Sequence, residues 1–220
     1  VFALALAAGA ATAQADVVAS LSYQTLTGSF TSTGATTGTF TANATTAGQA
    51  SAGNSTGNVT REPAGGNAAF FPGFSGVAPA AFSLSLSVTG ITGTGASASG
   101  LFTATDVLGN TIAGSITGTW IFSNQPGIQL AFFDGLLSNV NYTAVNGNLF
   151  TGNSGAANMA GIGSNLPGGL QITFLQSVPP SIFSVDIPVV STVVQAQITP
   201  TPGALALVGL GGLAAARRRR

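Results

Sequence analysis

The side chains with the clearest capacity for chemistry are the interior acids Asp106, Asp134 and Asp186. Two of them could form a glycosidase pair, because that reaction needs two carboxylates flanking the glycosidic bond. Carboxylate oxygens also bind Ca²⁺, but no Asp-rich calcium loop surrounds any of the three. Each acid lies beside an expected turn or strand end, where Asp commonly accepts hydrogen bonds from nearby backbone amides. Turn formation is therefore the favoured role for all three.

The chain lacks the bases on which most hydrolytic mechanisms depend. It contains no His and no Cys, and its five basic residues are all arginines. A Ser-His-Asp triad and a Ser-Lys dyad are therefore impossible within this chain, and a thiolate metal site is excluded. The sequence predicts a protein that is not an enzyme and that uses no cofactor and no metal.

Charge is scarce along the whole chain, at 5% of residues against roughly 25% in an ordinary soluble domain. Between Asp16 and Thr199 one arginine stands against five acids, which gives a net charge of −4. A basic surface for nucleic acid is therefore absent from this part of the chain. The adjacent Arg61 and Glu62 could orient a polar ligand, but neighbouring residues of an extended chain point apart. We interpret this pair as a solvated turn before Pro63, because exposed ion pairs contribute little.

Three aromatic side chains could stack on sugar rings, namely Tyr23, Trp120 and Tyr142. Trp120 lies an even number of residues from Ile112 and Ile116, so the three side chains share one face of the expected strand, which favours core packing for Trp120. The face on which Tyr142 lies is not assigned by its neighbours.

The middle of the chain has the alternation of β-strands. Residues 82–89 alternate between apolar and hydroxyl side chains, which places one face in a core and the other in water. Residues 101–105 and 111–122 flank a turn at residues 106–110 and predict a hairpin. Gly114 and Gly118 lie inside the second of these strands, where glycine marks a bulge or a close approach of a neighbouring strand.

Further strands follow towards the C-terminus. The pair Asn146-Gly147 predicts a type I′ hairpin turn between residues 142–145 and 148–151, because both residues tolerate positive φ. The segment 152–169 is expected to be a long loop, and residues 32–58 are either strands of low apolar content or a loose loop. The other expected strands are residues 128–133, 170–176, 182–187 and 189–199.

About ten short strands at this spacing predict an all-β domain over residues 16–199. The expected architecture is an antiparallel β-sandwich with Greek-key or jelly-roll connections. A parallel β-helix is the competing fold, since Thr-Gly pairs recur, but they follow no fixed period. The hairpin turns favour antiparallel pairing, and no stretch of residues 17–199 has a convincing helical period.

The N-terminal segment has the form of a secretory signal peptide. Residues 1–15 are an apolar, Ala-rich run that ends in a small-x-small cleavage site at Ala13 and Ala15. An initiator Met and a basic segment are missing from its start, so we expect further residues before Val1. An Ala-rich buried helix is the alternative interpretation.

The C-terminal tail places prolines before an apolar run, and arginines after that run. Residues 204–216 would span about 20 Å as a helix, against about 30 Å of hydrocarbon, so the predicted short hydrophobic helix is a marginal membrane anchor. The terminal arginines can reach the interface and fix the orientation of the anchor. They are Arg217, Arg218, Arg219 and Arg220.

This tail resembles the PEP-CTERM sorting signal, in which a Pro-Glu-Pro-like motif precedes an apolar helix and a basic end. Thr201 stands where that family usually has Glu, and the resemblance covers only about a tenth of the chain. It implies export across the inner membrane of a Gram-negative-type bacterium and recognition by an exosortase, with cleavage near the prolines. It also implies an association with extracellular polysaccharide and biofilm matrix. The motif itself is Pro200, Thr201, Pro202 and Gly203.

Together these features predict an exported protein of the cell surface or extracellular matrix, transiently anchored in the inner membrane. Its expected role is structural or adhesive within an exopolysaccharide, with the exosortase, the membrane and the exopolysaccharide as partners. A carbohydrate-binding module is the first alternative, and a glycosidase that uses the interior acids is the second.

Overall fold

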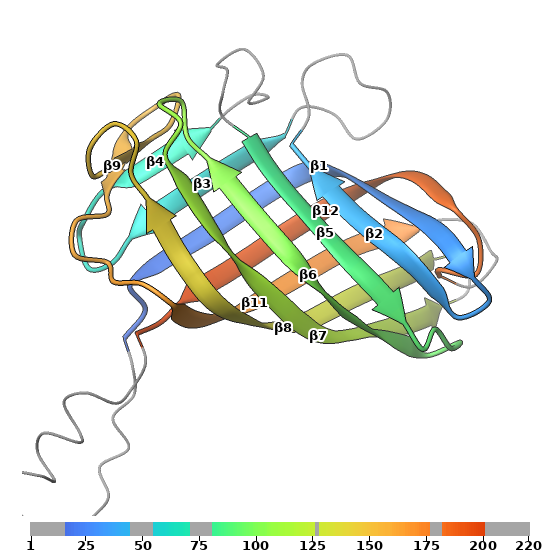
Figure 1. Ribbon diagram of the computed structural model, residues 1–220. Coiled ribbons are helices and arrows are strands. Elements are labelled where there is room, and N and C mark those ends of the chain that lie inside the picture. The colour runs from blue at the N-terminus through green and yellow to red at the C-terminus, as the bar shows by residue number, and fades with distance from the viewer. Residues whose placement is uncertain (1–15, 45–54, 71–80, 126–127, 177–181, 201–220) are drawn as a thin grey trace, which may run out of the picture.

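The computed structural model describes residues 16–44, 55–70, 81–125, 128–176 and 182–200. The secondary structure of these residues is all β, without a helix (Figure 1). The strands are β1 (Ala19–Gly34), β2 (Thr37–Asn43), β3 (Thr56–Arg61), β4 (Asn67–Phe70), β5 (Ala81–Thr89), β6 (Gly95–Thr105), β7 (Thr111–Gln125), β8 (Ile128–Thr143), β9 (Leu149–Thr151), β10 (Ala156–Asn158), β11 (Leu166–Gln176) and β12 (Ile187–Ile198).

Eight of these strands form a closed antiparallel barrel rather than a sandwich. The order β12-β11-β8-β7-β6-β5-β2-β1 is closed by pairing of β1 with β12, where Ala19 lies opposite Ile198 and Phe30 opposite Ile187. The prediction of a β-sandwich was therefore wrong, although the all-β class and the antiparallel pairing are confirmed. Alternation along a strand is the same in both architectures, and closure leaves no free edge between the first and last strands.

The barrel strands follow one another in an up-and-down order, so the predicted Greek-key or jelly-roll connections are also wrong. Each barrel strand pairs with the next barrel strand along the chain, and the β3–β4 and β9–β10 hairpins are excursions from this path. Short connections between neighbouring strands suffice for this topology.

One strand joins the barrel to the first excursion. The same edge of β1 pairs with β3 over its first part and with β2 over its second part. The change of partner falls at Thr25, whose φ is 56°, next to a register shift against β12. Beyond β3, Ala69 of β4 and Gly66 just before this strand make isolated bridges to Ser154 and Ala157, in the segment around β10.

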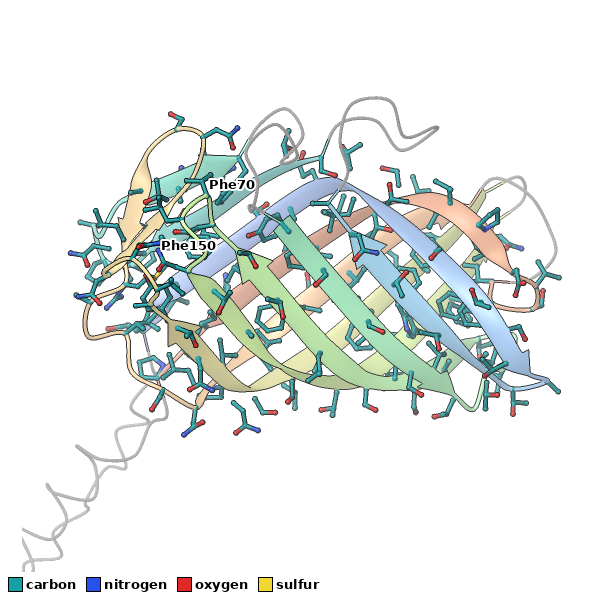
Figure 2. All side chains as sticks on the ribbon, turned by 45° about the horizontal axis from the view of Figure 1, so that its top comes forward. Phe70 and Phe150 are labelled. Carbon is teal, nitrogen blue, oxygen red and sulfur yellow. The ribbon has the colours of Figure 1, made fainter. Side chains whose placement is uncertain are left out.

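The two ends of the barrel are closed in different ways. At the end where β1 begins and β12 ends, the β3–β4 and β9–β10 hairpins lie together on the left in Figure 1, and we call this the capped end. Phe70 of β4 and Phe150 of β9 meet there edge to face, with ring centroids 6.0 Å apart (Figure 2). The opposite end, which we call the plugged end, is filled by Phe183 from the segment between β11 and β12.

Residues 182–187 do not form the strand expected from the sequence. These residues form turns that lead into β12, and the side chains of Ile182 and Phe183 are buried. The Phe183 ring stacks on Phe30 at 4.2 Å and meets Trp120 edge to face at 5.2 Å. An apolar run next to Pro179-Pro180 resembles a strand in sequence, but here its hydrophobicity serves to fill the barrel mouth.

The interior is a packed aromatic core. Side chains of β5 alternate strictly between exposed and buried, which confirms the pattern expected for residues 82–89. Trp120 is fully buried with Ile112 and Ile116, as their shared parity predicted. An eight-stranded barrel is just wide enough for side chains to fill it. Rings of Phe40, Trp120 and Phe174 pack there with centroids 5.0–5.5 Å apart.

Both glycines of β7 have the predicted role. Gly114 lies at the register shift between β7 and β8, which is the bulge. A Cβ on Gly118 would lie 2.3 Å from the carbonyl oxygen of Asp134, so only glycine permits this close approach.

The predicted targeting segments lie outside the described residues, except for Pro200. This applies to Ala13 and Ala15, to Thr201, Pro202 and Gly203, to the expected C-terminal helix, and to Arg217, Arg218, Arg219 and Arg220. In the part of the chain that the structure describes, no helix has the length and apolarity needed to cross a membrane.

Candidate functional site

Asp106 is completely buried at the capped end and serves as a structural anchor. Its Oδ1 accepts hydrogen bonds from the backbone N–H groups of Leu108 and Asn110, both at 2.8 Å. Its Oδ2 accepts two more, from Asn110 Nδ2 and from the N–H of Thr151, also at 2.8 Å. This confirms the predicted turn role, with an addition that the sequence did not indicate: the same carboxylate also holds β9.

Asn110 extends this network to the loop between β8 and β9. It is also completely buried, and its Oδ1 accepts hydrogen bonds from the N–H groups of Val145 and Asn146 at 2.7 and 2.9 Å. The side-chain amide of Asn146 donates in turn to the carbonyl of Leu108 at 2.6 Å. The Asn110 amide group donates to the carbonyl of Leu149 at 2.9 Å.

The predicted Asn146-Gly147 hairpin is therefore wrong. Strand β8 pairs with β7 and β11, whereas β9 pairs with β10, so the residues on the two sides of Asn146-Gly147 are not partners. Side-chain hydrogen bonds from Asn110 hold this loop in place of a strand ladder. Tyr142, which is half-buried, donates its hydroxyl to the carbonyl of Gly147 at 3.0 Å. Burial, and after it the charge of Asp106, raise the pKa of Tyr142.

The expected long loop over residues 152–169 is interrupted by structure. It contains β10 and the first residues of β11. Within residues 32–58, the described part resolves into strands, with β2 and the start of β3.

Asp186 and Arg61 both form hydrogen bonds with backbone groups. Asp186 Oδ1 accepts a hydrogen bond from the N–H of Ser32 at 2.7 Å at the plugged end, which fits its predicted turn role. The Arg61 guanidinium donates to the carbonyls of Val18, at 2.7 Å, and of Glu62. The Arg61-Glu62 pair thus forms part of the turn after β3, as the sequence indicated.

Asp134 departs from its prediction, because it lies in the middle of β8 rather than beside a turn. It is exposed on the outer face, opposite Thr119 of β7 and Gln171 of β11. The three interior acids therefore occupy the capped end, the outer wall and the plugged end, and no two form a pair. Among the described residues, no cluster of three or more acids, His or Cys could hold a metal ion.

The surroundings of Asp134 form the candidate functional site, a shallow groove of about 360 Å³ on the outside of the barrel. It crosses four neighbouring strands, β8, β11, β12 and β1. The register places Asp134 opposite Gln171, Gln171 opposite Gln195, and Gln195 opposite Ser22. The polar lining consists of Ser20, Ser22, Asp134, Gln171, Gln195 and Gln197.

The hollow exists because one strand position has no side chain. Gly169 faces outward between Gln197 and Leu136, and a Cβ built on it would meet nothing within 4 Å. Its two neighbours across the sheet therefore stand on either side of bare backbone. Leu136, which is 70% exposed, adds an apolar surface beside the groove.

The polar groups of the groove are available to a ligand. Within the described residues, none of its six polar side chains has a hydrogen-bond partner. Some outward-facing hydroxyls of the barrel do pair, as Ser29 does with Thr41 at 2.8 Å, whereas others, such as Ser83 and Ser85, have no partner among the described residues. The groove thus presents amides, hydroxyls and one carboxylate that no described residue engages.

A second hollow continues the groove towards Asp16 and Glu62. It has a volume of about 430 Å³ and shares Ser20 and Gln197 with the first. Asp16 and Glu62 line its far side. Arg61, the neighbour of Glu62, is engaged with backbone carbonyls.

Sequence reasoning missed the glutamines of this site and misjudged one aromatic. Gln195 and Gln197 alternate with apolar residues and so share the outer face of β12, a pattern that could have identified them. Their proximity to Asp134 depends on barrel register and could not have been found from the sequence. Tyr23 is fully buried, which removes it as a sugar-stacking residue.

The chain matches no protein-family model, no curated protein and no solved structure.

Proposed function

We propose that this chain is an exported, exosortase-processed protein of the cell surface or extracellular matrix with a structural or adhesive role in exopolysaccharide. The observation that carries the proposal is the C-terminal order of proline motif, apolar run and four arginines over residues 200–220. The apolar Ala-rich segment at residues 1–15 supports export independently.

The barrel supports a passive role outside the cell. Its core is filled by aromatic rings, and its outer face carries mainly Ser and Thr with few charges, as on β5, where all three serines face outward. Such a surface is hydrated by hydroxyl groups and does not repel neutral polymers. A domain of this kind suits a matrix in which it packs among polysaccharide chains.

The positions of the acids support a non-enzymatic role. Asp106 accepts four hydrogen bonds in the interior, Asp186 accepts one from the backbone, and Asp134 lies on the outer wall, away from both. A glycosidase needs two carboxylates on opposite sides of one bond, and these three lie on separate parts of the barrel.

A carbohydrate-binding module remains the second candidate function, and one observation favours it. The groove around Asp134 presents amide, hydroxyl and carboxylate groups without partners among the described residues. This function is compatible with the first, because a matrix protein can bind the polymer that surrounds it.

Intact mass of the protein recovered from the envelope and medium of its native host tests the proposal. We expect a mass that lacks residues 1–15 and the arginine tail. A matched variant, Pro200→Ala combined with Pro202→Ala, should retain the tail while its barrel still folds. Full-length protein in the cytoplasm, or a wild-type tail that stays intact at the surface, would contradict export and processing.

A further inference from the structure

We infer that the outer groove over β8, β11, β12 and β1 is a binding site for an uncharged polysaccharide chain. The inference deepens the proposed function and rests on it for the source of the polymer.

The groove is open at both ends, a shape that suits a polysaccharide chain better than a small molecule. The row from Asp134 through Gln171 and Gln195 to Ser22 crosses three strand spacings, or about 14 Å. The hollow beside Glu62 extends this track at one end. A polymer can lie along it and leave at either end, whereas small-molecule sites usually enclose most of the ligand.

The chemistry of the lining matches sugar hydroxyls. Each Gln side chain offers an amide that both donates and accepts, and each Ser hydroxyl does the same. The Asp134 carboxylate accepts charge-assisted hydrogen bonds, which are the stronger kind. Gly169 leaves space for a ring to approach the backbone, and Leu136 beside it offers an apolar surface for the C–H face of that ring.

The charge of the track excludes an anionic polymer. Carboxylates of Asp134, Asp16 and Glu62 line the two joined hollows, and none of the described residues that line them is basic. Like charges across an interface are unfavourable, so uronate-bearing or sulfated chains should be repelled. An uncharged polymer satisfies the donors and acceptors without this cost.

Affinity electrophoresis of the full chain tests the inference. The neutral probes are the purified neutral exopolysaccharide of the native host, dextran and galactomannan, with alginate as the anionic probe and chitosan as the amine-bearing probe. We expect retardation by at least one neutral polymer and none by alginate. Retardation by no neutral polymer, by alginate, or by chitosan alone would overturn the inference.

Variants of the groove separate binding from folding. Gly169→Val should fill the hollow and abolish retardation, and Asp134→Asn should weaken binding about tenfold, because one charge-assisted hydrogen bond is lost. Thr103→Ala, on the outer face of β6, is the matched control and should bind as wild type. Tryptophan fluorescence of Trp120 verifies that each barrel is folded. Equal binding by all three variants would show that the groove is not the site.

The outcomes of this test and of the processing test are distinguishable. A processed, exported protein whose groove binds no neutral polymer would leave the proposed location intact and remove the groove from the account. An unprocessed cytoplasmic protein that binds through Gly169 and Asp134 would leave the site intact and remove the proposed location.

Discussion

The barrel interior and the outer groove are built from alternate residues of the same strands, yet their chemistry is opposite. On β11, Leu170 and Ile172 point into the core while Gly169 and Gln171 face the groove. Inside, the rings of Phe40, Trp120 and Phe174 pack with centroids 5.0–5.5 Å apart; in the groove, the polar side chains have no hydrogen-bond partner among the described residues. Stability and the inferred recognition of a polymer are therefore expected to be separable, because a change on one face need not affect the other.

The largest loss of stability is expected when the Phe183 ring is removed from the plugged end. Phe183→Ala removes a buried ring that contacts Phe30 and Trp120, so we expect a loss of about 3–5 kcal/mol in the free energy of unfolding. Urea denaturation checks this value. Val185→Ala, which shortens an exposed side chain beside the plugged end, is the matched control. A loss below about 1 kcal/mol would mean that the plug does not close the core.

A smaller loss is expected from the hydrogen-bonded hub at the capped end. Asp106→Asn keeps the shape of the side chain but turns one acceptor into a donor that faces Asn110 Nδ2 or the N–H of Thr151. We expect about 2–3 kcal/mol of destabilisation, because a buried donor is left unpaired. Amide hydrogen exchange should show the loss as faster exchange at Thr151. Unchanged protection of the Thr151 amide would contradict the proposed role of Asp106 in holding β9.

The interior should also create a dependence of stability on alkaline pH. Burial raises the pKa of Tyr23, so the folded state keeps this proton while the unfolded state loses it above about pH 10. Stability is therefore fully present below the unfolded pKa and falls above it, by about 1.4 kcal/mol per pH unit. Urea denaturation at pH 9 to 11 measures the slope. Tyr23→Phe should remove most of it, and an unchanged slope in this variant would assign the effect elsewhere.

The smallest effect on stability is expected on the groove face. Gln171→Ala should change the free energy of unfolding by less than about 0.5 kcal/mol, because the side chain is exposed and has no partner among the described residues. The same variant should weaken retardation by a neutral polysaccharide. Thermal denaturation together with affinity electrophoresis measures both quantities on one sample. A large loss of stability in Gln171→Ala would contradict the expectation that the groove face contributes little to folding.

The sequence predicted the strands well and their closure poorly. Alternation identified β5, the β6–β7 hairpin and the burial of Trp120, because those depend on local residue order. It could not distinguish a barrel from a sandwich, since the pairing of β1 with β12 joins residues far apart in the chain. The Asn146-Gly147 turn failed for a related reason: the distant side chain of Asn110 replaces the expected ladder.

The candidate site was predictable only in its parts. Asp134 was recognised as a potential ligand group, but its expected place beside a turn was wrong. Gln171 and Gln195 are ordinary polar strand residues in sequence, and their alignment with Asp134 comes from the register of three strands. The open space at Gly169 is likewise a property of the folded sheet, because its neighbours Gln197 and Leu136 come from β12 and β8.

The inferred division between a packed interior and a polymer-binding outer face is tested most directly by NMR titration of the ¹⁵N-labelled chain with a neutral oligosaccharide. The account predicts shifts of backbone amides along the groove, at Gly169, Gln171 and Gln195, while the single indole N–H of Trp120 inside the barrel stays unchanged. Shifts of the Trp120 indole without shifts in the groove would place the ligand in the interior and contradict the account.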